Sequence, residues 1–91
     1  MDHISATHLE AFLAYGNASI AVCEVNELAR RSRPDARALE LLAELKAAHT
    51  ELRELFANGL DGAVCALAQD IMELAAATAD SLEQDQEPSG W

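Results

Sequence analysis

Residues 38–56, which read ALELLAELKAAHTELRELF, decide the fold of this chain. At about 100° per residue, their apolar positions fall on one helical face with alternating steps of three and four residues. This face comprises Ala38, Leu41, Leu45, Ala48, Leu52 and Leu55, with Leu42, His49 and Phe56 beside it. The spacing predicts an amphipathic helix with a coiled-coil-like seam.

The composition favours the same structure over the whole chain. Its 91 residues include 19 alanines and 13 leucines, with few β-branched and aromatic residues. Such a composition favours helix over sheet, and the length allows one small domain, which we place at residues 1–83. A multidomain enzyme is excluded.

Turn and capping residues divide the chain into three helices. Thr7 and Glu10 have capping-box spacing and open a helix over residues 7–31. Pro34 suits the first turn of a second helix over 34–57, with Ser32 or Arg33 as its N-cap. Asn58 and Gly59 end that helix.

Asp61 is expected to cap a third helix over residues 62–83. That helix repeats the design, with an apolar face of Val64, Leu67, Ile71, Leu74, Thr78 and Leu82. The polar residues 84–91 are read as an acidic flexible tail. We therefore predict an all-α, antiparallel three-helix bundle of long helices.

The first helix differs because it has two apolar stripes. One contains Leu9, Phe12, Leu13, Gly16, Ile20 and Cys23; the other, on roughly the opposite side, contains Ala11, Ala14, Ala18, Ala21, Val22 and Val25. A helix that is apolar on two sides is normally buried on both. We expect the small-residue stripe to form an interface with a second copy, so that a homodimer completes the core, or otherwise with a target protein.

The formal net charge is −10, from 16 acidic and six basic residues, so nucleic acids and anionic membranes are repelled. Two groups of charged residues are candidate docking sites. They are the basic cluster Arg30, Arg31, Arg33 and Arg37, and the acidic ridge Glu40, Glu44, Glu51 and Glu54. The acidic ridge allows a second hypothesis, an inhibitor that imitates DNA.

Cys23 and Cys65 lie far apart, without metal-finger spacing, and are expected to be buried thiols. The N-terminus does not resemble a signal peptide, and no stretch approaches a membrane span of about 18 apolar residues. A cytoplasmic location is the expectation.

His49 is the residue with the clearest chemical alternatives. The stretch Ala48-His49-Thr50, followed by Gly59, resembles the histidine phosphotransfer modules of bacterial signalling, which would make His49 a phosphoryl acceptor. Those modules have a lysine three residues after the histidine and a small glycine beside it, whereas this chain has Leu52 and Arg53 and lacks a fourth helix. The alternative is a partly buried histidine with a hydrogen-bonded ring nitrogen.

Catalytic, metal and cofactor sites are not indicated. The glutamates lie opposite the seam, whereas a carboxylate metal site needs them in the core. Neither cysteine has a base nearby in sequence, and the glycines form no phosphate loop. The sequence therefore predicts a non-enzymatic protein-binding regulator of the anti-activator, adaptor or chaperone type, which masks a partner's surface.

Overall fold

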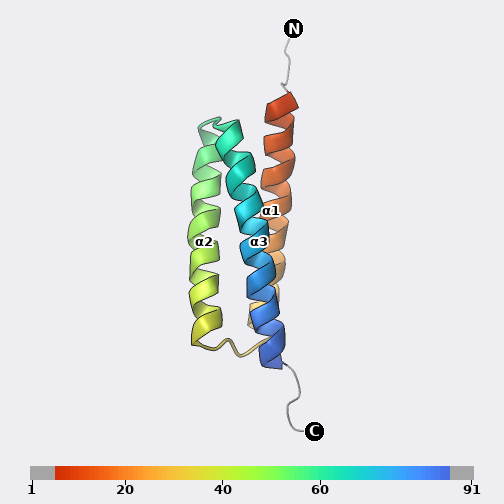
Figure 1. The fold of residues 1–91 in the computed structure, drawn as a ribbon, viewed down its shortest axis with the longest axis vertical. Helices are drawn as coiled ribbons and strands as arrows, with labels where there is room; N and C mark the ends of the chain where they lie inside the picture. The colour runs from red at the N-terminus through yellow and green to blue at the C-terminus, as the bar shows by residue number, and fades with distance from the viewer. Residues whose placement is uncertain (1–5, 87–91) are drawn as a thin grey trace.

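A computed structural model describes residues 6–86, which form three helices and no strand (Figure 1). Helix α1 covers Ala6–Arg30, α2 covers Ala36–Ala57 and α3 covers Asp61–Gln86. Successive helices run in opposite directions, which confirms the predicted all-α, antiparallel three-helix bundle. Helix α3 continues three residues beyond the predicted end, so the expected tail does not begin at residue 84. Residues 87–91 lie outside the described part.

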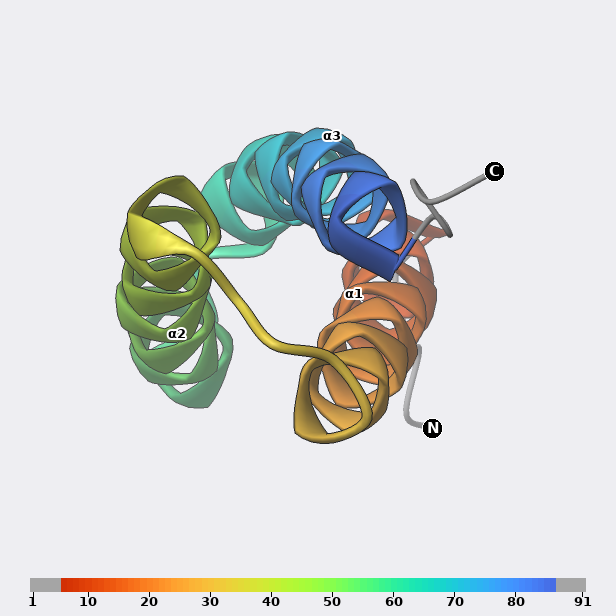
Figure 2. The ribbon, with the colours of Figure 1, turned by 90° about the horizontal axis from the view of Figure 1, so that it is seen from below.

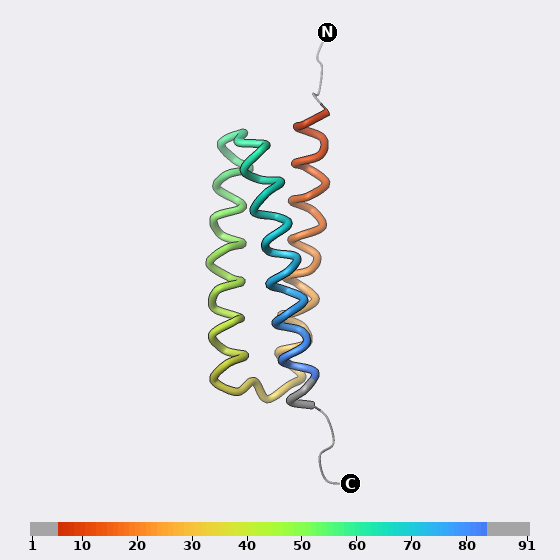
Figure 3. The backbone as a smooth tube through the Cα atoms, in the orientation of Figure 1, coloured from red at the N-terminus to blue at the C-terminus, as the bar shows by residue number. Residues whose placement is uncertain are grey.

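Helix α3 lies between the other two helices and is inclined to both. It begins beside α2, at the tight turn, and ends beside the last turns of α1 (Figure 3). Seen along the bundle, the three helices occupy the corners of a triangle, and residues 31–35 cross its open side from α1 to α2 (Figure 2).

The two connections have different caps. Asp35 is the N-cap of α2, and its carboxylate accepts a hydrogen bond of 2.8 Å from the Ala38 amide. The predicted N-cap, Ser32 or Arg33, is wrong, because the Ser32 hydroxyl donates to the Leu28 carbonyl at the end of α1 instead. The predicted end of α2 is confirmed: Gly59 has φ +73°, a left-handed conformation that favours glycine.

The core contains the predicted faces of α2 and α3. Ala38, Leu41, Leu45 and Leu52 are buried on α2; Val64, Ile71, Thr78 and Leu82 are buried on α3. Thr78 is compatible with this environment because its hydroxyl donates a 2.7 Å hydrogen bond to the Leu74 carbonyl. The small residues Ala68 and Ala75 also face the core from α3.

Helix α1 is turned the other way from our expectation. The small-residue stripe faces the protein's own core, where Ala11, Ala18, Val22 and Val25 are buried and Ala14 and Ala21 pack at the edge. The large apolar residues of the other stripe are exposed instead. Small side chains allow neighbouring helix axes to approach closely, and the equally small Ala68 and Ala75 of α3 belong to the same core cluster. The candidate interface residues are therefore occupied within the protomer.

Candidate functional site

The most unusual surface of the molecule is the outer face of α1, defined as Leu9, Phe12, Leu13, Gly16, Ile20 and Cys23. Leu9, Phe12, Leu13 and Ile20 are between 51% and 58% exposed. Their spacing of three and four residues places them on one side of the helix, opposite the buried alanines. Scattered apolar side chains are ordinary on a protein surface, but a contiguous row of them marks an interaction site.

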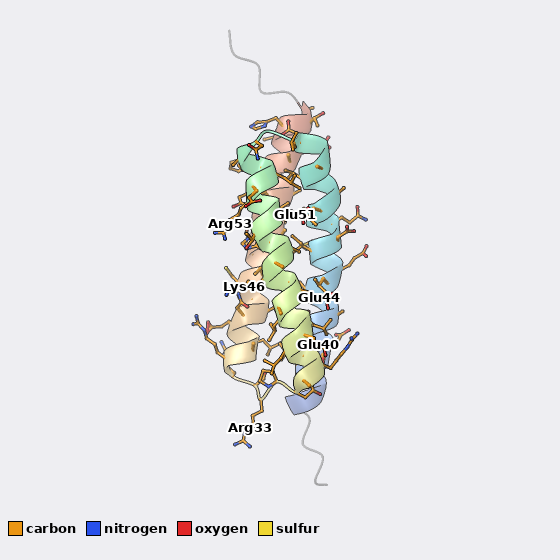
Figure 4. All side chains as sticks on the ribbon, turned by 90° about the vertical axis from the view of Figure 1, so that its left-hand side faces the viewer. Arg33, Glu40, Glu44, Lys46, Glu51 and Arg53 are labelled. Carbon is orange, nitrogen blue, oxygen red and sulfur yellow. The ribbon has the colours of Figure 1, made fainter. Side chains whose placement is uncertain are left out.

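The outer face is also free of charge. No acidic or basic residue occurs between Ala11 and Cys23, although 24% of the chain is charged. Charged residues begin on its flanks. Lys46 and Arg53 project from the α1 side of α2 (Figure 4), and Glu24 borders α3 on the other flank of α1.

Aromatic rings fill the contact between the first half of α1 and the last two turns of α2. The Tyr15 ring stacks on Phe56 with centroids 4.6 Å apart, and Phe12 approaches the same ring edge-on at 6.2 Å. The His8 ring also stacks on Phe56, with the two ring centroids 6.2 Å apart. Phe12 thus belongs both to this cluster and to the outer face, so the cluster holds one end of the exposed surface in place.

Ser19 and His49 extend this contact along the two helices. The Ser19 Oγ lies 3.0 Å from Nε2 of His49, and the Tyr15 ring stacks on the imidazole at 6.3 Å. Burial lowers the pKa of His49 from its ordinary value, and the nearby positive charge of Arg53 lowers it further. The lowered pKa favours the neutral imidazole, whose Nε2 shares the hydrogen bond with the Ser19 hydroxyl.

This placement bears on the phosphotransfer hypothesis. A phosphoryl-accepting histidine must present an open ring nitrogen to a donor domain, whereas His49 is half-buried between helices with Nε2 next to Ser19. The geometry favours a structural role for His49, as a satisfied polar group inside the α1–α2 contact.

His8 forms a second cross-helix contact at the same end of the bundle. Its Nδ1 lies 3.2 Å from a carboxylate oxygen of Asp61, the first residue of α3. The negative charge of Asp61 is favourable in the first turn of α3. Its contact with the His8 ring connects the start of α3 to the start of α1. Together with the ring cluster, this contact joins all three helices at the N-terminal end of α1.

The candidate charged sites lie at the surface, away from the outer face. Arg30, Arg31, Arg33 and Arg37 are exposed around the link between α1 and α2, as are Glu40, Glu44, Glu51 and Glu54 on α2. Figure 4 shows Glu40, Glu44 and Glu51 along one side of α2, with Arg33, Lys46 and Arg53 on the other. The Arg30–Glu27 ion pair, at 3.7 Å and well exposed, contributes little to stability.

A shallow apolar groove runs between α1 and α3, beside the outer face. Its volume is about 280 Å³, and small side chains together with Met72 and Leu28 line it. Met72 is 44% exposed. The groove exists because both helices contribute alanines here, which bring the backbones together but leave no bulk at the rim.

Cysteine and metal chemistry add no further site among residues 6–83. Cys65 is partly buried, but Cys23 is exposed, so its predicted burial is wrong: it lies on the stripe that α1 turns outward. No group of three or more His, Cys, Asp or Glu side chains in this part of the chain could hold a metal ion.

One described helix reaches the minimum length and composition for a membrane span, which differs from our expectation that none would approach it. Residues Asp61–Glu83 of α3 have a mean hydropathy of 1.2. The same residues supply Val64, Ile71 and Leu82 to the core. The criterion is also met by core helices of bundles, so it does not by itself indicate a membrane protein.

Searches of protein-family models, of curated proteins and of solved structures gave no match to this chain.

Proposed function

We propose that this protein is a small, non-enzymatic protein-binding regulator of the cytosol, which masks an apolar surface of a partner. The observation that carries the proposal is the outer face of α1, where four large apolar side chains are more than half exposed and three of them, Phe12, Leu13 and Ile20, lie on an uncharged stretch. This surface replaces the alanine stripe as the binding face, because that stripe is buried in the protomer.

The energetics suit binding to another protein. Removing the exposed parts of Leu9, Phe12, Leu13 and Ile20 from water contributes about 4 kcal/mol in total. Helix α1 is already ordered by its packing on α2 and α3, so little conformational entropy is lost on association. A preformed apolar helix face fits a hydrophobic groove on a partner, and occupation of that groove is the masking step.

A matched pair of substitutions tests the face. Leu13 on α1 and Leu39 on α2 are both 56% exposed, so Leu13→Arg and Leu39→Arg make the same chemical change at equal exposure. Tagged protein is used to capture partners from the source cell. The proposal predicts a stoichiometric partner that Leu13→Arg loses and Leu39→Arg retains. Equal capture by both variants would contradict it.

A second candidate function rests on the acidic side of α2. Glu40, Glu44, Glu51 and Glu54 are all exposed and occupy one side of the helix, a one-sided row of carboxylates like the phosphates of a nucleic-acid strand. Such a row could occupy a nucleic-acid-binding surface. This function predicts a partner that DNA displaces in a salt-sensitive way and that Glu44→Lys with Glu51→Lys abolishes, while Leu13→Arg leaves it bound.

A further inference from the structure

Gly16 has no role inside the protomer that explains a glycine. It lies in the interior of α1, where glycine is less favourable than alanine. Among the described residues, only Gly59 has a positive φ, and a Cβ built on Gly16 would meet nothing within 4 Å. Neither the backbone conformation nor packing within this chain therefore requires it.

The surroundings of Gly16 point to a contact made from outside. Leu13 and Ile20 flank it along the helix, both more than half exposed, and Leu9 and Cys23 continue the row on either side. The order Leu9, Leu13, Gly16, Ile20 and Cys23 has alternating steps of four and three, the spacing of a helix–helix seam. A glycine between large residues forms a hollow where a second helix backbone can approach most closely.

We propose that the occupant of this face, in the absence of a target, is the α1 helix of a second copy of this chain, crossing at Gly16. The inference rests on the proposed function in one respect, namely that the outer face is a protein-binding surface. Self-association then competes with target binding for the same residues.

Charge favours a second copy as the occupant. Two chains of net charge −10 repel each other, and the uncharged stretch from Ala11 to Cys23 is where they can touch without bringing acidic side chains together. The flanks are self-complementary, because Lys46 and Arg53 border one side of the face and Glu24 borders the other. A two-fold axis along α1 places the basic flank of each protomer opposite the acidic flank of the other.

A stable dimer needs more buried area than the outer face alone provides, so the neighbouring groove must contribute as well. The outer face runs from Leu9 to Cys23, so at 1.5 Å per residue it is about 22 Å long and, at about 10 Å wide, covers roughly 220 Å². A standard stable interface buries about 800 Å² on each partner. The groove between α1 and α3, with Met72 at its rim, is continuous with the outer face through Glu24 and supplies further apolar surface.

The test compares two glycines. Gly16 and Gly62 are both helical, and a Cβ on either meets nothing within 4 Å, so Gly16→Leu and Gly62→Leu should both fold. Sedimentation of the full chain from low to high micromolar concentration should show a dimer for the wild type and Gly62→Leu. Gly16→Leu should weaken dimerisation by about tenfold or more. A monomeric wild type, or an unchanged Gly16→Leu dimer, overturns the inference.

Cys23 tests the parallel arrangement. In a Cys65→Ser background, a short bismaleimide should link Cys23 to Cys23 of the second copy, and Gly16→Leu should remove the product. A dimer that gives no such product overturns the parallel two-fold axis. The capture experiment with Leu13→Arg distinguishes the two failures, because a monomeric protein that still loses its target in that variant retains the proposed function.

Discussion

Ser19 on α1 and His49 on α2 are joined by a side-chain hydrogen bond, with 3.0 Å between Oγ and Nε2. This bond lies in the contact between α1 and α2, next to the stacked rings of Tyr15 and His49. Burial of the imidazole and the nearby charge of Arg53 make the stability of the bundle depend on the charge of His49.

The first prediction is a loss of stability in mild acid. Burial and Arg53 hold the pKa of His49 below its ordinary value of 6.5, so the unfolded chain takes up a proton first. The contribution of neutral His49 is complete above a pH of about 6.5 and falls as the pH drops toward the folded-state pKa. Urea unfolding across this range should show a steeper pH dependence for the wild type than for His49→Gln. Parallel curves would assign the effect to other groups.

The second prediction concerns the Ser19 hydroxyl and the ring cluster. Ser19→Ala should lower the free energy of unfolding by about 1 kcal/mol, since it leaves a partly buried nitrogen of His49 without its partner.

A double-mutant cycle with Tyr15→Leu and Phe56→Leu should give a coupling of about 1 kcal/mol for their stacked rings. A coupling near zero would show that the two rings contribute only through separate burial.

The third prediction separates the buried face of α1 from the exposed one. Ala18 is fully buried, so Ala18→Leu overpacks the helix contact and should cost about 2 kcal/mol, and Ala18→Arg should prevent folding. Ala43→Leu, at an exposed site on α2, should change stability by less than about 0.5 kcal/mol. A stable Ala18→Arg variant with altered association would instead restore the original interface assignment.

The fourth prediction is that Gly16→Ala stabilises the folded protomer and weakens its dimerisation. Gly16→Ala should raise the free energy of unfolding by up to about 1 kcal/mol, measured at low protein concentration, because alanine favours helix and the new methyl meets nothing. The same methyl fills the hollow between two crossing helices, so dimerisation should weaken. Thermal unfolding at low and high concentration measures both effects. An increase in both would argue against a backbone contact at Gly16.

The fold could be predicted from sequence because each helix carries local signals that agree. The alternating steps on α2 and α3 identified their buried faces, and Asn58 with Gly59 marked the turn between them. The N-cap of α2 was misplaced because Pro34 was assigned to its first turn, whereas the helix begins at Ala36, after its N-cap Asp35. Ser32, Arg33 and Asp35 lie within four residues, and the sequence alone does not show which of them is the N-cap of α2.

The candidate site was harder to predict because α1 has two apolar stripes of similar width. Hydrophobicity ranks Leu9, Leu13 and Ile20 above alanine, and the larger residues were therefore assigned to the core. In the structure the order is reversed: Ala11 and Ala18 are buried in one core cluster with the small Ala68 and Ala75 of α3, and the larger residues lie outside. The contact of α1 with the aromatic residues of α2 could have been predicted from the sequence. One edge of α1 carries His8, Phe12, Tyr15 and Ser19 at steps of three and four residues.

The burial of alanine and valine on α1 separates two roles that most helices combine. The fully buried residues of α1 are small and lie on one side, while the residues available to a partner are large and lie on the other. Substitutions at Leu9, Leu13 or Ile20 therefore alter what the protein recognises with little consequence for whether it folds. A lineage carrying this scaffold can change its binding partner by single steps, each of which leaves a folded protein for selection to act on.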